Sequence, residues 1–420
     1  MKTKAVRIYG IKDLRLEEFD LPPMKDDEIL ARVVSDSICM SSHKAALQGA
    51  GHKRVPDDVA VNPAIIGHEF AGVILKVGKK WRDKFSEGQK FSIQPAMAHM
   101  GTLDAPGYSF RYIGGDATYI IIPDIVMEAD CLLPYDGDAF FPASLSEPMS
   151  CIVGAFHASY HVPPGTYIHE MGIREGGYMV ILAGTGPMGL GAIDYALHQQ
   201  RKPSMLVVTD IDEKRLARAA CLFKPEDAEK EGIKLIYVNT GKIENPVEYL
   251  RGLTGGKGYD DVFVFAPVKQ VVQQADAILG FDGCLNFFAG PSKTDFTAEI
   301  NFYNVHYSFT HIVGTSGGNT DDMRESLRLM SEGRINPAVM ITHVGGLDSV
   351  IETTLNLPAI PGGKKLIYTN ISMPLVSLYK LEEMGKSDPF YKGLHEIVAE
   401  NDYIWNPEAE RYLLANARPI

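Results

Sequence analysis

The sequence predicts an α/β protein that combines a doubly wound parallel sheet with a mostly β domain. Three observations lead to this prediction. The chain has 420 residues, which is more than one hydrophobic core usually holds, so we expect two domains. Short β-type runs separated by Gly, Pro and Asp fill the first 150 residues. From about residue 177, continuous apolar runs alternate with helical stretches, a pattern typical of parallel strands that are buried on both faces.

The β-type runs of the first part have the lengths and boundaries of short strands. Residues 29–34 (ILARVV) and 71–77 (AGVILKV) are examples, and a third run begins at residue 88. No long helical period interrupts these runs, which favours a mostly β domain. Similar short runs return after about residue 330, before a charged, aromatic tail that starts at residue 381.

The middle of the chain alternates between predicted strands and predicted helices. Strands are expected at residues 178–183, 205–210, 235–238, 261–265 and 284–288, and helices at residues 213–222 and 271–279. Strands that alternate with helices in this way build a parallel sheet from strand–helix–strand units. This part of the chain therefore predicts the doubly wound domain.

The composition narrows the classes of partner. The net charge is −12, which argues against nucleic acid or an anionic membrane surface as the main partner. No apolar run is long enough to span a bilayer, and the first residues lack the apolar segment of a secretory signal. The five cysteines are widely scattered, which argues against a disulfide framework and suits a reducing compartment. We therefore expect a cytoplasmic protein with a small-molecule partner.

A glycine-rich turn follows the first predicted strand of the parallel sheet and precedes a helical stretch. Its residues are Gly184, Thr185, Gly186, Pro187, Met188 and Gly189. In a G-x-G-x-x-G turn, the first glycine makes the tight turn and the second lets backbone approach a pyrophosphate. The third lets helix and strand pack closely, while the helix N-terminus favours negative charge. The turn therefore predicts a dinucleotide site.

An acidic residue completes the nucleotide pattern. Asp210 lies 21 residues beyond Gly189, at the end of the second predicted strand. A carboxylate there accepts hydrogen bonds from the adenosine ribose and repels the 2′-phosphate of NADP, so we expect NAD(H) in preference to NADP(H). The alternative is a glycine turn without a ligand and an ordinary Asp at a strand end. The order strand, loop, helix, strand and acid favours the cofactor.

Residues of types that bind metal ions stand in three short segments. Cys39 lies in Ile-Cys-Met-Ser-Ser, His68 and Glu69 lie in Gly-His-Glu-Phe-Ala-Gly, and Glu147 lies in Ser-Glu-Pro. Taken singly, each has an ordinary explanation as a small buried side chain, a core histidine or a helix-starting acid. Hydride leaves an alcohol carbon easily only from the alkoxide, and a zinc ion with three protein ligands and one open position stabilises that charge.

Together, these segments resemble the zinc-containing alcohol and polyol dehydrogenases of the medium-chain dehydrogenase/reductase family. The order Cys-x-Ser, Gly-His-Glu-x-x-Gly, Glu-Pro and glycine-rich turn carries the resemblance over roughly residues 1–370. It implies a GroES-like β domain made from both ends of the chain around an inserted Rossmann domain. We expect domain limits of 1–160, 161–330 and 331–420, the last segment including a C-terminal extension. The resemblance also implies a homodimer or homotetramer.

The resemblance assigns roles to the metal-type residues. Cys39, His68 and Glu147 match the positions that hold or approach one catalytic zinc ion, and Glu69 matches a conditional ligand. Ser41 occupies the position that relays the proton. Many members also carry a four-cysteine lobe for a structural zinc, but residues 90–120 contain no cysteine, so we expect no second zinc ion.

Two positions depart from the family pattern. Ser42 stands where the family often has Asp, which leaves the support of the zinc ligands open. Lys44 stands where alcohol dehydrogenases often have a relay histidine, and we expect a catalytic role for it. A lysine at this position also suits a substrate phosphate.

Basic residues gather after the first metal-type residue. They are His43, Lys44, His52, Lys53 and Arg54, and Arg111 follows later in an aromatic segment. Such cations suit a phosphate at the far end of a sugar substrate. The run from 52 to 54 is also typical of a solvated face, and for this run we favour that interpretation. We expect an oxidoreductase that acts on a polyol or ketose phosphate.

Three other functions compete with this one. An unphosphorylated polyol or alcohol dehydrogenase would use the same metal and cofactor. A zinc-free quinone or enoyl reductase of the same fold would not need the metal-type residues. A non-catalytic nucleotide-binding protein could keep the glycine turn and lose those residues. All of them are present, which favours the zinc-dependent enzyme.

Overall fold

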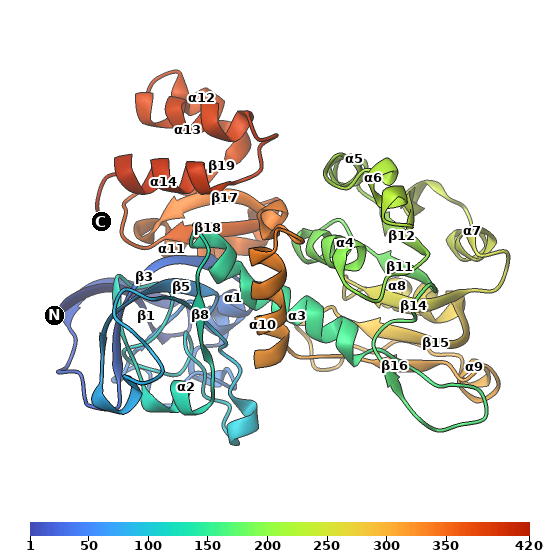
Figure 1. The fold of residues 1–420 in the computed structure, drawn as a ribbon, viewed down its shortest axis with the longest axis horizontal. Helices are drawn as coiled ribbons and strands as arrows, with labels where there is room; N and C mark the ends of the chain where they lie inside the picture. The colour runs from blue at the N-terminus through green and yellow to red at the C-terminus, as the bar shows by residue number, and fades with distance from the viewer. The chain divides into compact units, whose positions relative to one another are not determined.

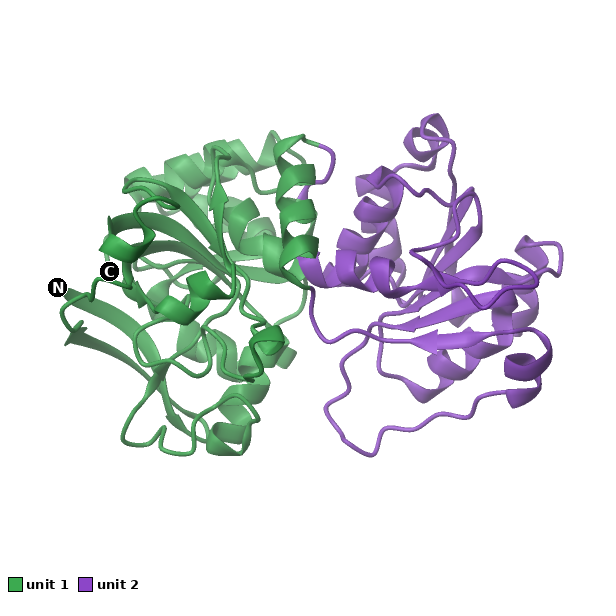
Figure 2. Cartoon of the chain, turned by 60° about the horizontal axis from the view of Figure 1, so that its bottom comes forward, with its two compact units in different colours: residues 1–148, 319–333, 337–420 green, residues 149–318, 334–336 purple.

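The computed structural model describes residues 1–420 and divides them into two compact units. Unit 1 consists of Met1–Pro148, Asn319–Gly333 and Pro337–Ile420, so both ends of the chain belong to it. Unit 2 consists of Met149–Gly318 and Arg334–Asn336 (Figure 2). No helix of the structure has the length and apolar character needed to cross a bilayer.

Unit 2 is built on a six-stranded sheet in which every neighbouring pair of strands is parallel (Figure 1). The strand order is β13 (Lys234–Asn239), β12 (Met205–Asp210), β11 (Tyr178–Leu182), β14 (Tyr259–Val264), β15 (Leu279–Phe287) and β16 (His311–Val313). The order therefore reverses beside β11, which is the place where open α/β sheets bind nucleotides. The predicted doubly wound sheet is confirmed.

Helices connect the successive strands of this sheet. They are α4 (Pro187–His198), α5 (Glu213–Leu222), α6 (Pro225–Lys230), α7 (Pro246–Leu253), α8 (Lys269–Ile278) and α9 (Phe302–Tyr307). Helix α5 contacts β12 and β13, helix α6 contacts β13, and helix α8 contacts β14 and β15. The short strands β9 (Tyr160–His161) and β10 (Glu170–Met171) form a separate ribbon. The sequence did not predict β16, because three residues at a sheet edge carry too little apolar pattern.

Unit 1 is built on an eight-stranded mixed sheet and a smaller three-stranded sheet. The large sheet runs β19 (Val376–Ser377), β17 (Ile341–Gly346), β18 (Lys364–Tyr368), β3 (Ile29–Ile38), β5 (Phe70–Val77), β6 (Lys90–Ile93) and β8 (Leu132–Tyr135), with β7 (Tyr119–Ile122) also pairing with β3. The small sheet runs β2 (Asp13–Asp20), β1 (Lys2–Gly10) and β4 (Ala64–Ile65). The second half of the chain thus supplies three strands to a sheet begun by the first half, as expected for an inserted domain.

The helices of unit 1 surround these sheets. They are α1 (Met40–Gln48), α2 (Asp124–Glu128), α10 (Thr320–Ser331), α11 (Val350–Asn356), α12 (Leu381–Gly385), α13 (Pro389–Ala399) and α14 (Pro407–Asn416). Helix α3 (Phe141–Ala158) begins in unit 1 and continues into unit 2. The tail that starts at residue 381, for which we predicted no helix or strand, therefore folds into α12, α13 and α14.

The tail is anchored by one buried carboxylate. Glu410 of α14 accepts hydrogen bonds from the backbone N–H groups of Phe140 and Phe141, at 2.6 and 2.9 Å. Tyr368 of β18 donates its hydroxyl proton to the same carboxylate at 2.8 Å, and Trp405 donates its indole N–H to the Tyr368 oxygen at 2.8 Å. A carboxylate at this end of α3 satisfies otherwise unpaired N–H groups and complements the helix dipole.

We predict that Glu410→Ala lowers the free energy of unfolding by ~2–4 kcal/mol, because it leaves backbone donors and the Tyr368 hydroxyl without their acceptor. Chemical denaturation followed by circular dichroism measures the change. Glu408→Ala, at an exposed position of the same helix, is the control and should change stability by no more than ~0.5 kcal/mol. Equal losses in the two variants would show that the carboxylate contributes nothing specific.

Candidate metal centre and nucleotide loop

The first metal-type residue stands between a strand and a helix. Strand β3 ends at Ile38, and Cys39 keeps an extended backbone (φ −106°, ψ 151°) as the N-cap residue of α1. Ser41 follows in the first turn of α1, and its Oγ lies 3.0 Å from the Cys39 Sγ. The cysteine and the predicted relay serine are therefore direct neighbours at the end of one sheet strand.

His68 reaches the same place from a tight turn. Gly67 adopts a φ of +89°, and a Cβ there would lie 2.5 Å from an Asp36 carboxylate oxygen, so only glycine fits. The His68 ring is buried, and its Nε2 lies 3.5 Å from Ser41 Oγ and 3.3 Å from the Tyr108 hydroxyl. Burial lowers the pKa of His68, which favours the neutral imidazole that a metal ion requires.

Ser42 supports His68 from the other side. Its hydroxyl lies 3.2 Å from His68 Nδ1. A histidine that offers Nε2 to a metal ion carries its proton on Nδ1, which here can donate to the Ser42 oxygen and fix the ring. The sequence left the support of the ligands open, because Ser replaces the usual Asp. The structure supplies a hydroxyl in place of the carboxylate.

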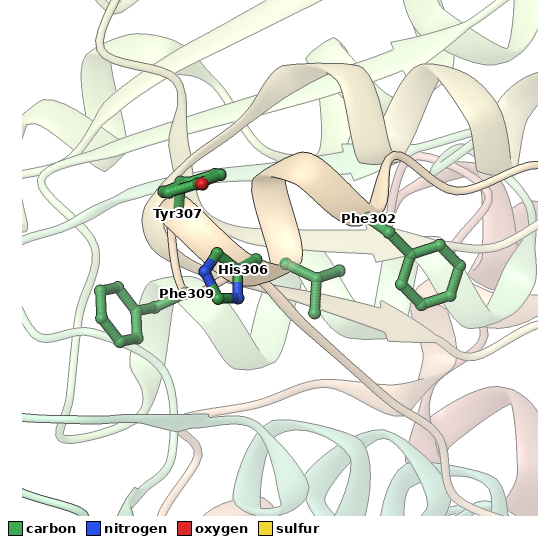
Figure 3. A pocket seen from close by; sticks show the side chains of 5 residues that line it. Phe302, His306, Tyr307 and Phe309 are labelled. Carbon is green, nitrogen blue, oxygen red and sulfur yellow. The ribbon is translucent and has the colours of Figure 1, made fainter.

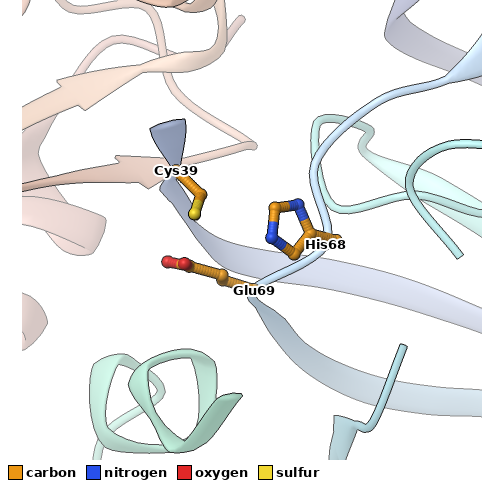
Figure 4. A group of neighbouring side chains, drawn as sticks. All are labelled: Cys39, His68 and Glu69. Atoms are coloured by element: carbon orange, nitrogen blue, oxygen red, sulfur yellow. The ribbon is translucent and has the colours of Figure 1, made fainter. Parts of the chain in front are cut away.

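Cys39, His68 and Glu69 come together closely enough to share an ion. One potential ligand atom from each lies within 4.8 Å of the others. Figure 4 shows the Cys39 sulfur and the His68 ring facing one another, with the Glu69 side chain beside them. A sulfur, an imidazole nitrogen and a carboxylate oxygen form a donor set that fits zinc.

Glu69 is, however, engaged by a lysine. Both of its carboxylate oxygens accept hydrogen bonds from Lys364 Nζ, at 2.5 and 2.7 Å, and both side chains are buried. Lys364 begins β18, whose next residue, Lys365, is paired with Ile38 of β3. The sheet register therefore brings Lys364 to the level of Cys39. Lys364 was not among the residues that the sequence motifs singled out.

The carboxyl group of Glu147 interacts electrostatically with these residues. It is the seventh residue of α3 and is half-buried. Burial raises its pKa to about 7, with His68 and Lys364 opposing that rise and Glu69 and Cys39 adding to it. Burial and Glu69 likewise raise the pKa of Cys39. A cation among these groups would favour the ionised forms of both Cys39 and Glu147.

Hydroxyl groups hold the turn of α3 that carries Glu147. Pro148 lies inside the helix and lacks the N–H that would bond to the Ser144 carbonyl. The Ser144 hydroxyl lies 2.9 Å from Ser35 Oγ of β3, and the Ser146 hydroxyl lies 2.9 Å from Ser92 Oγ of β6. These contacts attach the weakened turn to two strands of the large sheet.

The basic residues predicted from the sequence differ in their surroundings. His43 is buried and bonds through Nδ1 to the Thr354 carbonyl oxygen at 2.8 Å, so its role is structural. Lys44 lies on α1 and is half-buried. Arg54 lies over the Tyr108 ring, with its guanidinium carbon 5.5 Å from the ring centroid. Arg111 is exposed and lies over Tyr112.

Unit 2 contains a second cluster of metal-type residues, formed by His161, Asp282 and His311. Its donors are already engaged. Arg174 pairs with Asp282 at 2.5 Å, and His161 Nε2 lies 3.2 Å from Asp261. His311 bonds through Nε2 to the Tyr160 carbonyl oxygen at 2.6 Å. Because a guanidinium already provides the positive charge, this cluster is best described as an ion-pair network.

The glycine turn has the geometry of a nucleotide loop. A Cβ on Gly189 would lie 2.1 Å from the Gly184 carbonyl oxygen, so close packing of α4 on the turn requires glycine. Gly186 is the N-cap residue of α4 and offers no side-chain cap, and Pro187 is the first helical residue. The N–H groups of this helix end are therefore available to an anion.

Asp210 ends β12 beside this turn. It accepts hydrogen bonds from the Thr185 hydroxyl and from the backbone N–H groups of Ile211 and Asp212, the last two at 2.8 and 3.1 Å. The carboxylate is thus fixed against the glycine turn. The turn and the acid come together, as the spacing in the sequence predicted.

The chain is similar to known proteins over nearly its whole length. Residues 25–129 match the alcohol dehydrogenase GroES-like domain, and residues 187–332 match the zinc-binding dehydrogenase family. The chain is 54% identical to mannitol-1-phosphate 5-dehydrogenase of Aliivibrio fischeri, over 98% of this chain and 97% of that protein. It is 53% identical to L-sorbose 1-phosphate reductase of Klebsiella pneumoniae, over 100% and 98%.

A solved structure shares the fold at lower identity. The 2R,3R-butanediol dehydrogenase of Bacillus subtilis matches with a TM-score of 0.70 and 21% identity, over 88% of this chain and all of that one. The matches to the mannitol-1-phosphate and L-sorbose 1-phosphate enzymes span nearly the whole chain. The match to the butanediol dehydrogenase structure covers less of the chain, 88%.

Proposed function

The chain belongs to the zinc-binding dehydrogenase family with a GroES-like domain, and on this premise we propose that it reduces a ketose phosphate to a polyol phosphate. The specific substrate that we propose is L-sorbose 1-phosphate, reduced to D-glucitol 6-phosphate. The observation that carries the proposal is the convergence of Cys39, His68 and Glu69 within 4.8 Å, beside Glu147.

We propose that Cys39, His68 and Glu147 hold one zinc ion. Glu69 serves as the conditional ligand, and its contacts with Lys364 support a resting position away from the metal ion. Zinc bound at such a site acts as a Lewis acid that polarises the substrate oxygen. The sequence offers no cysteines for a structural zinc ion between residues 90 and 120.

Ser41 is the residue that we propose for proton transfer at the substrate oxygen. Its hydroxyl lies 3.0 Å from Cys39 Sγ, so it borders the ligand group directly. Hydroxyl groups both donate and accept hydrogen bonds, which suits a relay. Lys44, three residues later on α1, is the outer member of the proposed relay.

The nicotinamide cofactor that we propose is NAD(H). The open N-terminus of α4 and the glycine turn suit its pyrophosphate, and the fixed Asp210 carboxylate suits the ribose hydroxyls. Gly184, Gly186, Pro187, Met188 and Gly189 provide the turn.

Mannitol 1-phosphate is a second candidate substrate, because the relative with that activity in its name is as similar as the sorbose 1-phosphate reductase. An unphosphorylated polyol remains the alternative, since the metal and cofactor residues would serve it equally. The cytoplasmic location stays a prediction from cysteine usage, and all five cysteines are free thiols in the structure.

We predict one zinc ion per chain. Cys39→Ser should remove most of the zinc and most of the turnover, while the circular dichroism spectrum and the binding of NADH remain. Elemental analysis of the purified protein and its variant measures the metal. Two zinc ions per chain, or full activity in a zinc-free preparation, would contradict the proposed site.

We predict that NADH is preferred over NADPH by about 10- to 100-fold in kcat/KM, because a carboxylate beside the 2′-phosphate repels it by a few kcal/mol. Asp210→Asn removes the charge and should reduce the preference for NADH over NADPH. Asp212→Asn is the control, since Asn keeps the helix cap that Asp212 provides for α5. An equal kcat/KM with both cofactors in the intact enzyme would show that the Asp210 carboxylate does not contact the ribose hydroxyls.

We predict that L-sorbose 1-phosphate is reduced with a kcat/KM roughly 10²- to 10⁴-fold above that of L-sorbose, since two charge-assisted hydrogen bonds to phosphate contribute ~1.5–3 kcal/mol each. Initial rates of NADH oxidation with both sugars and with D-fructose 6-phosphate measure the preference. Equal efficiency with the free sugar and its phosphate would favour the plain polyol dehydrogenase instead.

A homodimer or homotetramer is the assembly that we propose. Strand β16 is the edge of the unit 2 sheet, and Ile312 within it is 49% exposed. Beside it, Phe302, Tyr307 and Phe309 line a shallow apolar pocket, which Figure 3 shows with His306. An exposed edge with apolar side chains suits pairing with a second copy around a two-fold axis.

We predict a mass of two or four times 46.2 kDa by light scattering. Ile312→Lys should lower that mass by placing a charge at the sheet edge. Ile11→Lys, at a more exposed isoleucine in unit 1 (68%), should leave the mass unchanged. A mass of 46.2 kDa for the intact chain would refute the assembly.

A further inference from the structure

We propose that Arg54 is the residue that binds the substrate phosphate. This inference rests on the proposed function and assigns one side chain to its substrate preference. Arg54 is half-buried, and no carboxylate of the structure forms an ion pair with it. In a chain with a net charge of −12, a partly buried guanidinium without an acidic partner is available for an anionic ligand.

The Arg54 side chain is connected to the metal-type residues through one aromatic ring. Its guanidinium carbon lies 5.5 Å from the centroid of the Tyr108 ring. The Tyr108 hydroxyl lies 3.3 Å from His68 Nε2, and the two rings are 4.8 Å apart. One end of Tyr108 therefore borders the proposed zinc ligand, and its ring supports the arginine. L-sorbose 1-phosphate carries its phosphate on the carbon next to the reacting carbonyl, so a phosphate-binding residue separated from the proposed zinc ligand by one ring suits this substrate.

The segment around Arg54 is held in place. Ser109, the residue after Tyr108, donates its hydroxyl proton to the Arg54 carbonyl oxygen at 2.7 Å. The backbone N–H of Arg54 donates to His52 Nδ1 at 3.3 Å, and the His52 ring stacks on Tyr108 at 5.7 Å. The backbone on both sides of the aromatic contact is therefore fixed. A guanidinium that lies over a ring keeps its N–H edges free for a bidentate contact with phosphate.

The surroundings of Tyr108 are positively charged. Burial lowers the pKa of His52, and the positive charges of Arg54, Lys53 and Lys44 lower it further. The carboxylates nearest to His68 are Glu147 and Glu69, and the proposed zinc ion and Lys364 would balance them. A phosphate placed against Arg54 therefore meets net positive charge.

Other basic residues fit this role less well. Lys53 is exposed, and Arg111 is exposed and lies over Tyr112 rather than Tyr108. Lys44 lies on α1 and contributes charge to the same region, but it is a point charge without the planar fork of arginine. Among the lysines and arginines of this region, Arg54 alone combines partial burial with a contact to the ring that borders His68.

The test compares the preference for phosphate in three variants. Arg54→Gln removes the charge, Arg54→Lys keeps the charge but not the fork, and Lys53→Gln removes an equal charge from the adjacent exposed position. Each variant is assayed by NADH oxidation with L-sorbose 1-phosphate and with L-sorbose. The measured quantity is the ratio of the two kcat/KM values, which a general loss of fold or metal lowers for both substrates alike.

We expect Arg54→Gln to lower this ratio by about 10- to 100-fold, mainly through KM for the phosphorylated sugar, and Arg54→Lys to lower it less. Lys53→Gln should keep the ratio within about threefold of the intact enzyme. If the intact enzyme prefers the phosphate and Arg54→Gln keeps that preference, the assignment of Arg54 is wrong while the proposed function stands. If the intact enzyme shows no preference, the proposed substrate class fails, and the role of Arg54 fails with it.

Discussion

Charge balance in a buried pocket is the constraint on which the organisation of unit 1 depends. Cys39, Glu69 and Glu147 can each carry a negative charge, and the nearest buried cation is Lys364. Lys364 pairs with Glu69 through both carboxylate oxygens, so its charge is committed to that residue. Ionised Cys39 and Glu147 still need a cation, because uncompensated buried charges cost several kcal/mol. A zinc ion held there would meet this need and would supply Lewis-acid chemistry to the pocket.

The fold meets the constraint by bringing distant segments to one end of the large sheet. Strand β3 delivers Cys39, the turn before β5 delivers His68 and Glu69, and β18 delivers Lys364 from the far end of the sequence. The same strand β18 carries Tyr368, which bonds to Glu410 of the C-terminal tail. The tail therefore holds the start of α3, the helix on which Glu147 lies.

Much of the fold was predictable because the signals were local. Continuous apolar strands and the glycine turn at Gly184 predicted the parallel sheet. Three short motifs singled out Cys39, His68, Glu69 and Glu147, and the structure brings ligand atoms of the first three within 4.8 Å of one another. Lys364 was not predictable, because its importance arises from strand register with β3, and a lysine at the start of an apolar strand has no special local pattern. Glu410 was not predicted, because its hydrogen-bond partner Phe140 lies far away in the sequence. Arg54 was interpreted as part of a solvated face, because the Tyr108 ring that it contacts belongs to another segment.

The measurement that tests the central claim most directly is zinc K-edge X-ray absorption on the purified protein. A site formed by Cys39, His68 and Glu147 predicts one sulfur at ~2.3 Å and two or three nitrogen or oxygen ligands at ~2.0–2.2 Å around each zinc ion. In the Cys39→Ser variant, any remaining zinc should show no sulfur. A spectrum without sulfur in the intact protein, or one with four sulfurs, would contradict the assignment of this pocket as the zinc site.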